Sequence, residues 1–146
     1  MRLIHMAFLT LCLTLGTGCA APPPANPAPR ATLGKPVTLA IGQSVMLNDA
    51  LVTIAFTGVS EDSRCPTKVN CVWTGRATVD LRVQANGEPA QNIALSTIHS
   101  PEKTNVTTVG GYRIEMTDVQ PYPETPDNPI SPDRYRVTLV VTQAPA

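Results

Sequence analysis

Few residues of this sequence are of the types that perform catalytic chemistry. After position 19 the chain contains a single histidine, His99, so any Ser–His–Asp triad would have to use it. Its nearest hydroxyl, Ser100, is adjacent in sequence, which does not establish the geometry of a triad. The motifs Gly-x-Ser-x-Gly and His-Glu-x-x-His are absent. We therefore expect a protein that is not an enzyme, and an enzyme that uses His99 is the alternative.

Two adjacent acidic residues, Glu61 and Asp62, suggest two further kinds of chemistry. A pair of carboxylates can cleave a glycosidic bond, but neighbouring residues of a strand point to opposite faces. Together with Asp118, these carboxylates could also supply oxygen ligands to calcium. The Asp-x-Asp-x-Asp-Gly pattern of calcium-binding loops is absent. We therefore expect neither a bound metal nor a cofactor.

Residues 1–18 have the features of an export signal. Arg2 supplies a positive charge, and the apolar run over residues 3–15 is too short to span a bilayer comfortably. Gly18 and Cys19 then resemble a bacterial lipoprotein box, in which the cysteine receives the lipid and becomes the new N-terminus. The resemblance implies lipidation at Cys19. Ordinary secretion, with cleavage one or two residues later, is the alternative.

Residues 19–34 are predicted to be the lipidated N-terminus and a proline-rich linker. Proline is frequent over residues 22–29 and excludes a helix or a central strand, so we expect an extended spacer of about 3 Å per residue. Ala20 directly after the cysteine resembles a signal for sorting to the outer membrane. The expected location is the cell envelope, with the lipid in the outer membrane and the domain facing the periplasm. A soluble periplasmic or secreted protein is the alternative.

Two of the four cysteines, Cys65 and Cys71, fall within the predicted domain. An exported chain meets an oxidising compartment, so we expect this pair to form a disulfide. Closing so short a loop stabilises the fold by roughly 2 to 2.5 kcal/mol in the chain-entropy relation. The alternatives are a metal pair and a redox pair. Zinc sites usually add further Cys or His ligands at short spacing, and redox pairs normally read Cys-x-x-Cys.

The rest of the chain shows strand and turn signals, without a convincing helical period. Over residues 77–84, apolar residues alternate with polar ones, which is typical of a strand with one buried face. Asn86-Gly87 follows and favours a two-residue type I′ turn. Strands are predicted at residues 37–40, 44–47, 51–59, 72–84, 90–98, 106–109, 112–119 and 135–142.

These elements predict an all-β domain over residues 35–144. About seven short antiparallel strands, with turn signals between them, are typical of a single β-sandwich or a small barrel. The proline-rich segment 121–129 cannot pair as a strand and is expected to be a loop.

The segment around the two cysteines resembles motifs of a known group of proteins. Asp62-Ser63-Arg64-Cys65-Pro66, followed by Cys71-Val72-Trp73-Thr74-Gly75, is similar to motifs shared by a group of small bacterial exported proteins and lipoproteins. Val119-Gln120-Pro121-Tyr122-Pro123 and the last strand also resemble that group, so the similarity extends over roughly residues 42–141. The resemblance implies an exported protein and does not imply a particular activity.

Residues of this motif have structural and functional interpretations. Asp62 and Arg64 are expected to brace the loop by charge-assisted hydrogen bonds. Trp73 is expected to cover the disulfide, and Gly75 to allow a bulge or a close approach of two chain segments. Loops held rigid by a scaffold often carry binding, and the candidate binding residues are Glu61, Asp62, Arg64, Lys68 and Trp73. Lys68, near the middle of the cysteine loop, raises the alternative of a protease inhibitor.

The net charge of the chain bears on which class of macromolecule it could bind. Lys plus Arg equals Asp plus Glu, so the formal net charge is zero and no segment is strongly basic. Nucleic-acid binding lacks its main driving force, because neutralising phosphates needs clustered cations. The sequence therefore predicts a non-catalytic envelope lipoprotein that binds another envelope protein or polymer, or has a structural role.

Overall fold

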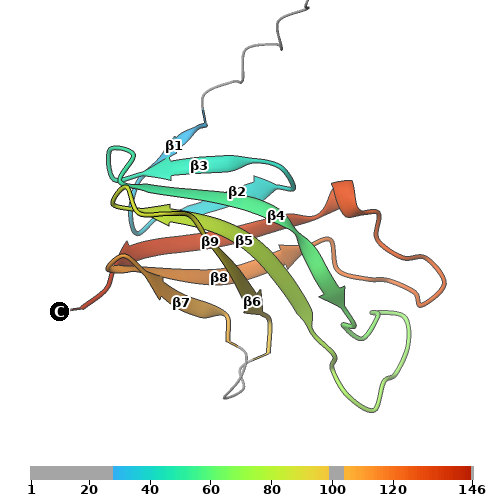
Figure 1. Cartoon of the computed structure of the whole chain (residues 1–146). Helices are drawn as coiled ribbons and strands as arrows, with labels where there is room; N and C mark the ends of the chain where they lie inside the picture. Colours follow the sequence, from blue (N-terminus) through green and yellow to red (C-terminus); the bar gives the residue numbers. More distant parts are fainter. Residues whose placement is uncertain (1–27, 99–103, 146) are drawn as a thin grey trace, which may run out of the picture.

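The computed structural model describes residues 28–98 and 104–145, and these form two packed β-sheets (Figure 1). The predicted all-β sandwich is confirmed, and the sheets do not close into a barrel. In spatial order, the five-stranded sheet contains β1 (Arg30–Ala31), β3 (Ser44–Leu47), β4 (Val52–Asp62), β5 (Ala77–Ala85) and β6 (Gln91–Ser96). The four-stranded sheet contains β2 (Pro36–Ala40), β9 (Arg136–Gln143), β8 (Tyr112–Gln120) and β7 (Val106–Val109).

The core lies between the two sheets and is built by alternation along each strand. In β5, Val79, Leu81 and Val83 are buried, whereas Arg82 and Gln84 are exposed. The opposite sheet shows the same period of two in β9. Inward side chains from both sheets interdigitate in this way in aligned sandwiches. The largest fully buried side chains come from both sheets and include Phe56, Leu39, Leu47, Ile54, Leu81, Leu95, Ile114 and Leu139.

The turn between β5 and β6 has the predicted conformation. Asn86 and Gly87 both have positive φ, 52° and 75°, as a type I′ turn requires. The backbone N–H of Glu88 donates to the carbonyl of Ala85 over 3.0 Å and closes the turn. The hairpin is therefore confirmed, with the return strand beginning at Gln91.

Two differences from the sequence-based expectation change the layout of the strands. The strand expected from residue 72 begins only at Ala77, because residues 72–76 return from the cysteine loop. Within the segment expected to be a linker, Arg30 and Ala31 form β1, which pairs in parallel with β3. The sandwich described here therefore has nine strands in place of about seven, and one pairing is parallel.

The point where the chain enters the sandwich lies far from the cysteine loop. Arg30 pairs with Met46, and Met46 pairs with Thr53 near the start of β4. The cysteine loop follows Asp62, at the other end of β4. The extended strand from position 53 to position 62 corresponds to about 30 Å. Figure 1 shows β1 and this loop at opposite ends of the molecule.

The predicted signal, Cys19 and His99 lie outside the described residues. Within residues 28–98 and 104–145, no helix is long and apolar enough to cross a membrane.

Candidate functional site: the strap loop

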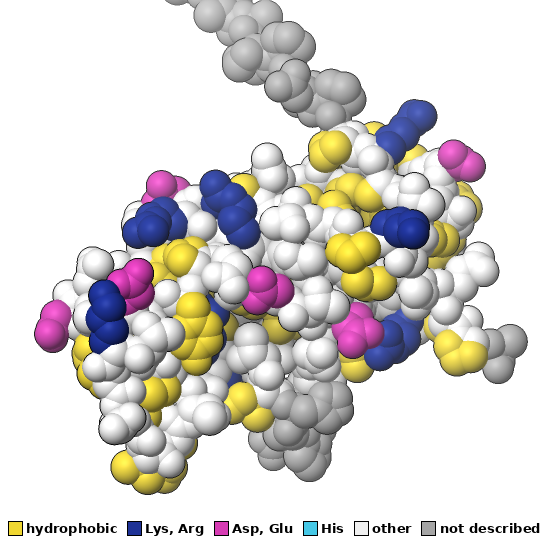
Figure 2. Space-filling model, turned by 180° about the vertical axis from the view of Figure 1, so that it is seen from behind, with side chains coloured by type: hydrophobic (Ala, Val, Ile, Leu, Met, Phe, Trp, Pro, Cys, Tyr) yellow, Lys and Arg dark blue, Asp and Glu magenta, His cyan; other side chains and the backbone are white. Residues whose placement is uncertain are grey.

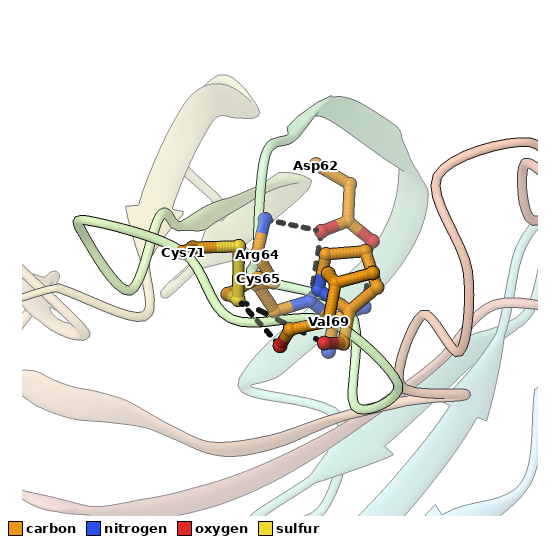
Figure 3. Close-up of a disulfide and its surroundings, with 6 residues drawn as sticks. Asp62, Arg64, Cys65, Val69 and Cys71 are labelled. Atoms are coloured by element: carbon orange, nitrogen blue, oxygen red, sulfur yellow. Dashed lines mark hydrogen bonds and ion pairs between the residues drawn. A yellow bond between two sulfur atoms is a disulfide. The ribbon is translucent and has the colours of Figure 1, made fainter.

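Residues 63–76 connect β4 to β5, and we name them the strap loop. A disulfide joins Cys65 to Cys71, with 5.9 Å between their Cα atoms, which confirms the predicted pairing (Figure 3). The ladder between β4 and β5 continues into the loop. The N–H of Ser63 donates to the carbonyl of Arg76 over 2.7 Å, and the N–H of Cys65 donates to Thr74 over 2.8 Å. The base of the strap loop is therefore fixed both by a covalent bond and by backbone pairing.

A buried ion pair between Asp62 and Arg64 braces this base, as the sequence predicted. Arg64 Nε donates to Asp62 Oδ1 over 2.8 Å, and Arg64 Nη2 donates to Oδ2 over 2.6 Å (Figure 3). The guanidinium thus contacts the carboxylate in the bidentate geometry that gives the strongest pairs. Arg64 is only 7% exposed, so its charge is withdrawn from solvent and depends on these partners.

Arg64 also ties the strap loop to the segment after β8. Its Nη1 donates to the carbonyl of Val119 over 2.7 Å, and its Nη2 donates to the carbonyl of Pro121 over 2.9 Å. The guanidinium carbon lies 4.8 Å from the ring centroid of Tyr122, which is a cation–π distance. One side chain therefore connects two loops that are 55 residues or more apart in sequence.

Tyr135, just before β9, completes this cluster. Its hydroxyl donates to Asp62 Oδ2 over 2.8 Å. Burial raises the pKa of Asp62, but the hydrogen bonds from Arg64 and Tyr135 outweigh it and hold that pKa below its ordinary value. Burial, and then the hydrogen bond to Asp62, raises the pKa of Tyr135 to about 12. The carboxylate of Asp62 is therefore paired with both the guanidinium of Arg64 and the hydroxyl of Tyr135.

The middle of the strap loop is bound to the β8–β9 loop. The N–H of Thr67 donates to Pro123, and the N–H of Lys68 donates to Glu124, over 3.0 and 3.1 Å. Lys68 Nζ pairs with Glu124 Oε2 at 2.5 Å, and this hydrogen bond lowers the pKa of Glu124. An inhibitory loop needs a free extended segment to enter a protease. Because both the backbone and the side chain of Lys68 face the neighbouring loop, the geometry does not favour that interpretation.

The close approach expected at Gly75 is present. Gly75 has a φ of +64°, which favours glycine, and a Cβ atom built on it would lie 1.7 Å from the carbonyl oxygen of Ser63. No other residue type fits without moving the backbone of one strand end.

The expectation that Trp73 covers the disulfide is wrong. Trp73 is 81% exposed, and its neighbour Val72 is 92% exposed. The ion pair of Arg64 and the ring of Tyr122 occupy the base of the loop, and Gly75 packs directly against Ser63. The loop instead presents two adjacent apolar side chains to solvent. Seen from behind, hydrophobic side chains lie at the tip of the lobe at the lower left (Figure 2).

The structure separates the two acidic residues that open the motif. Glu61 pairs with Arg76 at 2.9 Å, at the partly exposed surface, whereas Asp62 faces Arg64 and Tyr135. The calcium interpretation would have required both carboxylates and Asp118 together. Among the described residues, no group of three His, Cys, Asp or Glu side chains could hold a metal ion.

A groove of about 320 Å³ lies beside the strap loop. The return of the loop at Thr74 and Gly75 forms one wall, and the segment after β6 at Thr97 forms another. The last residues of β8 and the ring of Tyr122 complete it. The same face is visibly hollowed next to the projecting lobe (Figure 2). Its volume is at the lower end of the range of small-ligand sites.

Sequence reasoning found the loop and missed its partners. Tyr122, Tyr135 and the groove residues of β8 come from distant parts of the chain, and no local pattern links them to Asp62. The only signal was the proline-flanked Tyr122, which resembled the same protein group. No family model, curated protein or solved structure matches this chain, so its function is inferred from the geometry of the strap loop and the groove.

Proposed function

We propose that this chain is a non-catalytic lipoprotein of the cell envelope that binds an envelope macromolecule through the tip of its strap loop. The observation that carries the proposal is the exposure of Val72 and Trp73, at 92% and 81%, on a loop whose base is rigid. Exposed adjacent apolar side chains lose favourable burial unless a partner covers them. Tryptophan is also among the residues that contribute most to binding energy at interfaces.

The rigidity of the loop supports recognition over a role as a passive connection. The disulfide, the Asp62–Arg64 pair and the bonds to Glu124 all limit the motion of the segment that carries Trp73. A loop that is already ordered loses less conformational entropy when it binds.

The position of the tether also supports the proposal. The chain enters at β1, about 30 Å of strand from the strap loop. If a lipid on Cys19 holds the chain at a membrane, the tip of the loop is directed away from the entry point. It is then free to contact a component outside that membrane.

A photo-crosslinking experiment tests the function. A photoreactive phenylalanine analogue is placed at position 73 or position 51 of the full-length chain, which is then irradiated in intact bacteria. Leu51 is the matched control, because it is 49% exposed and precedes β4 at the other end of the sandwich. We expect a defined adduct from position 73 and none from position 51. Equal adducts from both positions, or none from position 73, would contradict the proposal.

A further inference from the structure

The edge of the five-stranded sheet at β6 is open to a further strand. The N–H of Thr97 donates to the carbonyl of Ala77 over 3.0 Å, so the odd-numbered residues of β6 bond to β5. The even-numbered residues Asn92 and Ala94 therefore direct their N–H and C=O groups away from β5. Among residues 28–98 and 104–145, no group accepts from these two N–H groups. The open edge is thus a row of backbone groups with unused hydrogen-bonding capacity.

The other edges of the two sheets are shortened or blocked. On β2, Pro36 has no N–H, and the N–H of Ala40 donates to Gln43 Oε1 over 2.8 Å. On β7, which has four residues, the N–H of Val106 donates to Thr104 Oγ1 over 3.2 Å. β1 has only two residues. Charged residues and proline are the usual protection of an edge, and the six residues of β6 include neither.

The two open positions of β6 are complementary to a second copy of the same strand. The N–H of Ser96 donates to the carbonyl of Thr104 over 2.9 Å, which closes the edge beyond them. In an antiparallel pair of two β6 strands centred on Ile93, Asn92 of each copy faces Ala94 of the other. Each facing pair can exchange two N–H···O bonds, so the outward groups of both residues are satisfied. The half-buried Ile93 lies opposite itself on the inner face, where its exposed part becomes covered.

The charges on the outer face of the sheet suit the same pairing. In β5, Arg82 lies beside Asn92, and Asp80 lies beside Ala94. Among the described residues, Arg82 has no hydrogen bond or ion pair. The pairing of two copies places Arg82 of each in the same row as Asp80 of the other, and the row between them holds only the uncharged side chains of positions 92 and 94. Opposite charges therefore share each row, and no like charges face each other directly.

From these observations we propose that two copies of this chain associate through their β6 edges, as an antiparallel pair about a two-fold axis at Ile93. The pair joins the two five-stranded sheets into one continuous sheet. Because each copy offers the same edge to the other, association ends at a dimer. The strands of the two copies run in opposite directions, so the two strap loops lie at opposite ends of the joined sheet and outside the contact. This inference goes beyond the proposed function and does not depend on it.

Disulfide trapping tests the pairing and its register. Full-length chains that carry Asn92→Cys or Ala94→Cys, with different tags, are produced together in bacteria and separated on a non-reducing gel. In the proposed pair, positions 92 and 94 of opposite copies have Cα atoms about 5.5 Å apart, within reach of a disulfide. Like positions lie on a diagonal of about 7 to 8 Å, which is too far. We expect a linked dimer from the mixed pair and little from either variant alone. Equal linkage in all three cases, or linkage of the mixed pair only to other proteins, would overturn the proposal.

Native mass spectrometry of the purified full-length chain, released from detergent, measures the dimer without added cysteines. Ala94→Pro removes an outward N–H without breaking a bond to β5, and Ala94→Lys places a charge on the edge. We expect each to weaken the dimer at least tenfold. Thr108→Lys is the matched control, because it places the same charge at an exposed position on the edge of β7 and should leave the dimer unchanged. A wild-type chain that stays monomeric at submillimolar concentration, or a dimer that survives both changes at Ala94, would contradict association through β6.

Discussion

The hydroxyl of Tyr135 donates a 2.8 Å hydrogen bond to Oδ2 of Asp62, and so joins the start of β9 to the end of β4 across 73 residues of sequence. Arg64 binds the same carboxylate and reaches the carbonyl groups of Val119 and Pro121. Asp62, whose side chain is 10% exposed, thus lies at the centre of contacts that join the ends of β4 and β8 to the start of β9. The exposed pair Val72 and Trp73 depends on this cluster for its position.

Tyr135→Phe should remove part of the decrease in the free energy of unfolding that the wild type shows above pH 10. The pKa of Tyr135 is raised to about 12 in the folded state, above its ordinary value of about 10. Its contribution is therefore complete below pH 10 and is lost as the pH rises toward 12. Below pH 10 we expect Tyr135→Phe to lower the free energy of unfolding by about 1 to 2 kcal/mol. Denaturant unfolding across pH 8 to 12 measures both effects.

The control is Tyr122→Phe, which keeps its ring against Arg64 and should unfold within about 0.5 kcal/mol of the wild type at pH 8. If Tyr135→Phe loses stability above pH 10 just as the wild type does, the hydrogen bond to Asp62 does not contribute as described.

Replacing one partner of the buried ion pair should be costly. Arg64→Met leaves Asp62 buried without its main partner, and we expect a loss of about 3 to 5 kcal/mol. Lys68→Met breaks the exposed pair with Glu124 and should cost less than about 1 kcal/mol. Urea unfolding of both variants gives the comparison. Similar losses in the two variants would show that burial of Arg64 is not what distinguishes the pairs.

Asp62 should also contribute to acid unfolding. Because its folded-state pKa is lowered, its contribution is complete above its ordinary pKa of about 3.9 and is lost as the pH falls through the folded value. Asp62→Asn should therefore be less stable than the wild type at pH 7, with the difference shrinking below pH 4. A difference that stays constant from pH 7 to pH 2 would exclude this linkage.

Gly75→Ala tests the close approach to Ser63. The added Cβ would lie 1.7 Å from a backbone oxygen, in a conformation with positive φ, so we expect a loss of about 2 to 4 kcal/mol. Gly58→Ala is the matched control within β4. A Cβ atom built on Gly58 would meet no other atom within 4 Å, and its φ is not positive, so this replacement should have little effect. Thermal unfolding measures the loss of stability in each variant, and we expect a large loss only for Gly75→Ala.

Trp73→Ala should leave stability unchanged, within about 0.5 kcal/mol, because the side chain is exposed. Removing the disulfide by Cys65→Ser with Cys71→Ser should cost about 2 kcal/mol. The contrast separates a residue presented for binding from one that packs on the disulfide. A loss for Trp73→Ala as large as that for the disulfide would place Trp73 in the folded core of the loop.

The sequence predicted those parts of the fold that depend on local pattern. Alternation in β5 indicated its buried face, and Asn86-Gly87 indicated the turn, because both follow from backbone geometry over a few residues. The brace of Asp62 and Arg64 was also predictable, since the two residues are separated by one position. Oxidation of Cys65 and Cys71 followed from the expected compartment.

The structural features that the sequence did not predict depend on contacts between distant segments of the chain. Trp73 is a large apolar residue of the type usually found in a core, yet it is 81% exposed, and no local sequence pattern indicated this exposure. The late start of β5, at Ala77, follows from the return of the cysteine loop over residues 72–76, which strand propensity did not indicate. Pairing of Arg30 with Met46 adds a strand to a segment whose prolines indicated a linker.

The most direct test of the central claim is oxidative footprinting of the native chain, followed by mass spectrometry. In the purified full-length protein, Trp73 and Leu51 should both be oxidised, as their exposures of 81% and 49% require. In intact bacterial envelopes, a binding role predicts that Trp73 becomes protected at least severalfold while Leu51 does not. Unchanged oxidation of Trp73 in the envelope would show that nothing covers the tip of the strap loop, and would contradict a binding role.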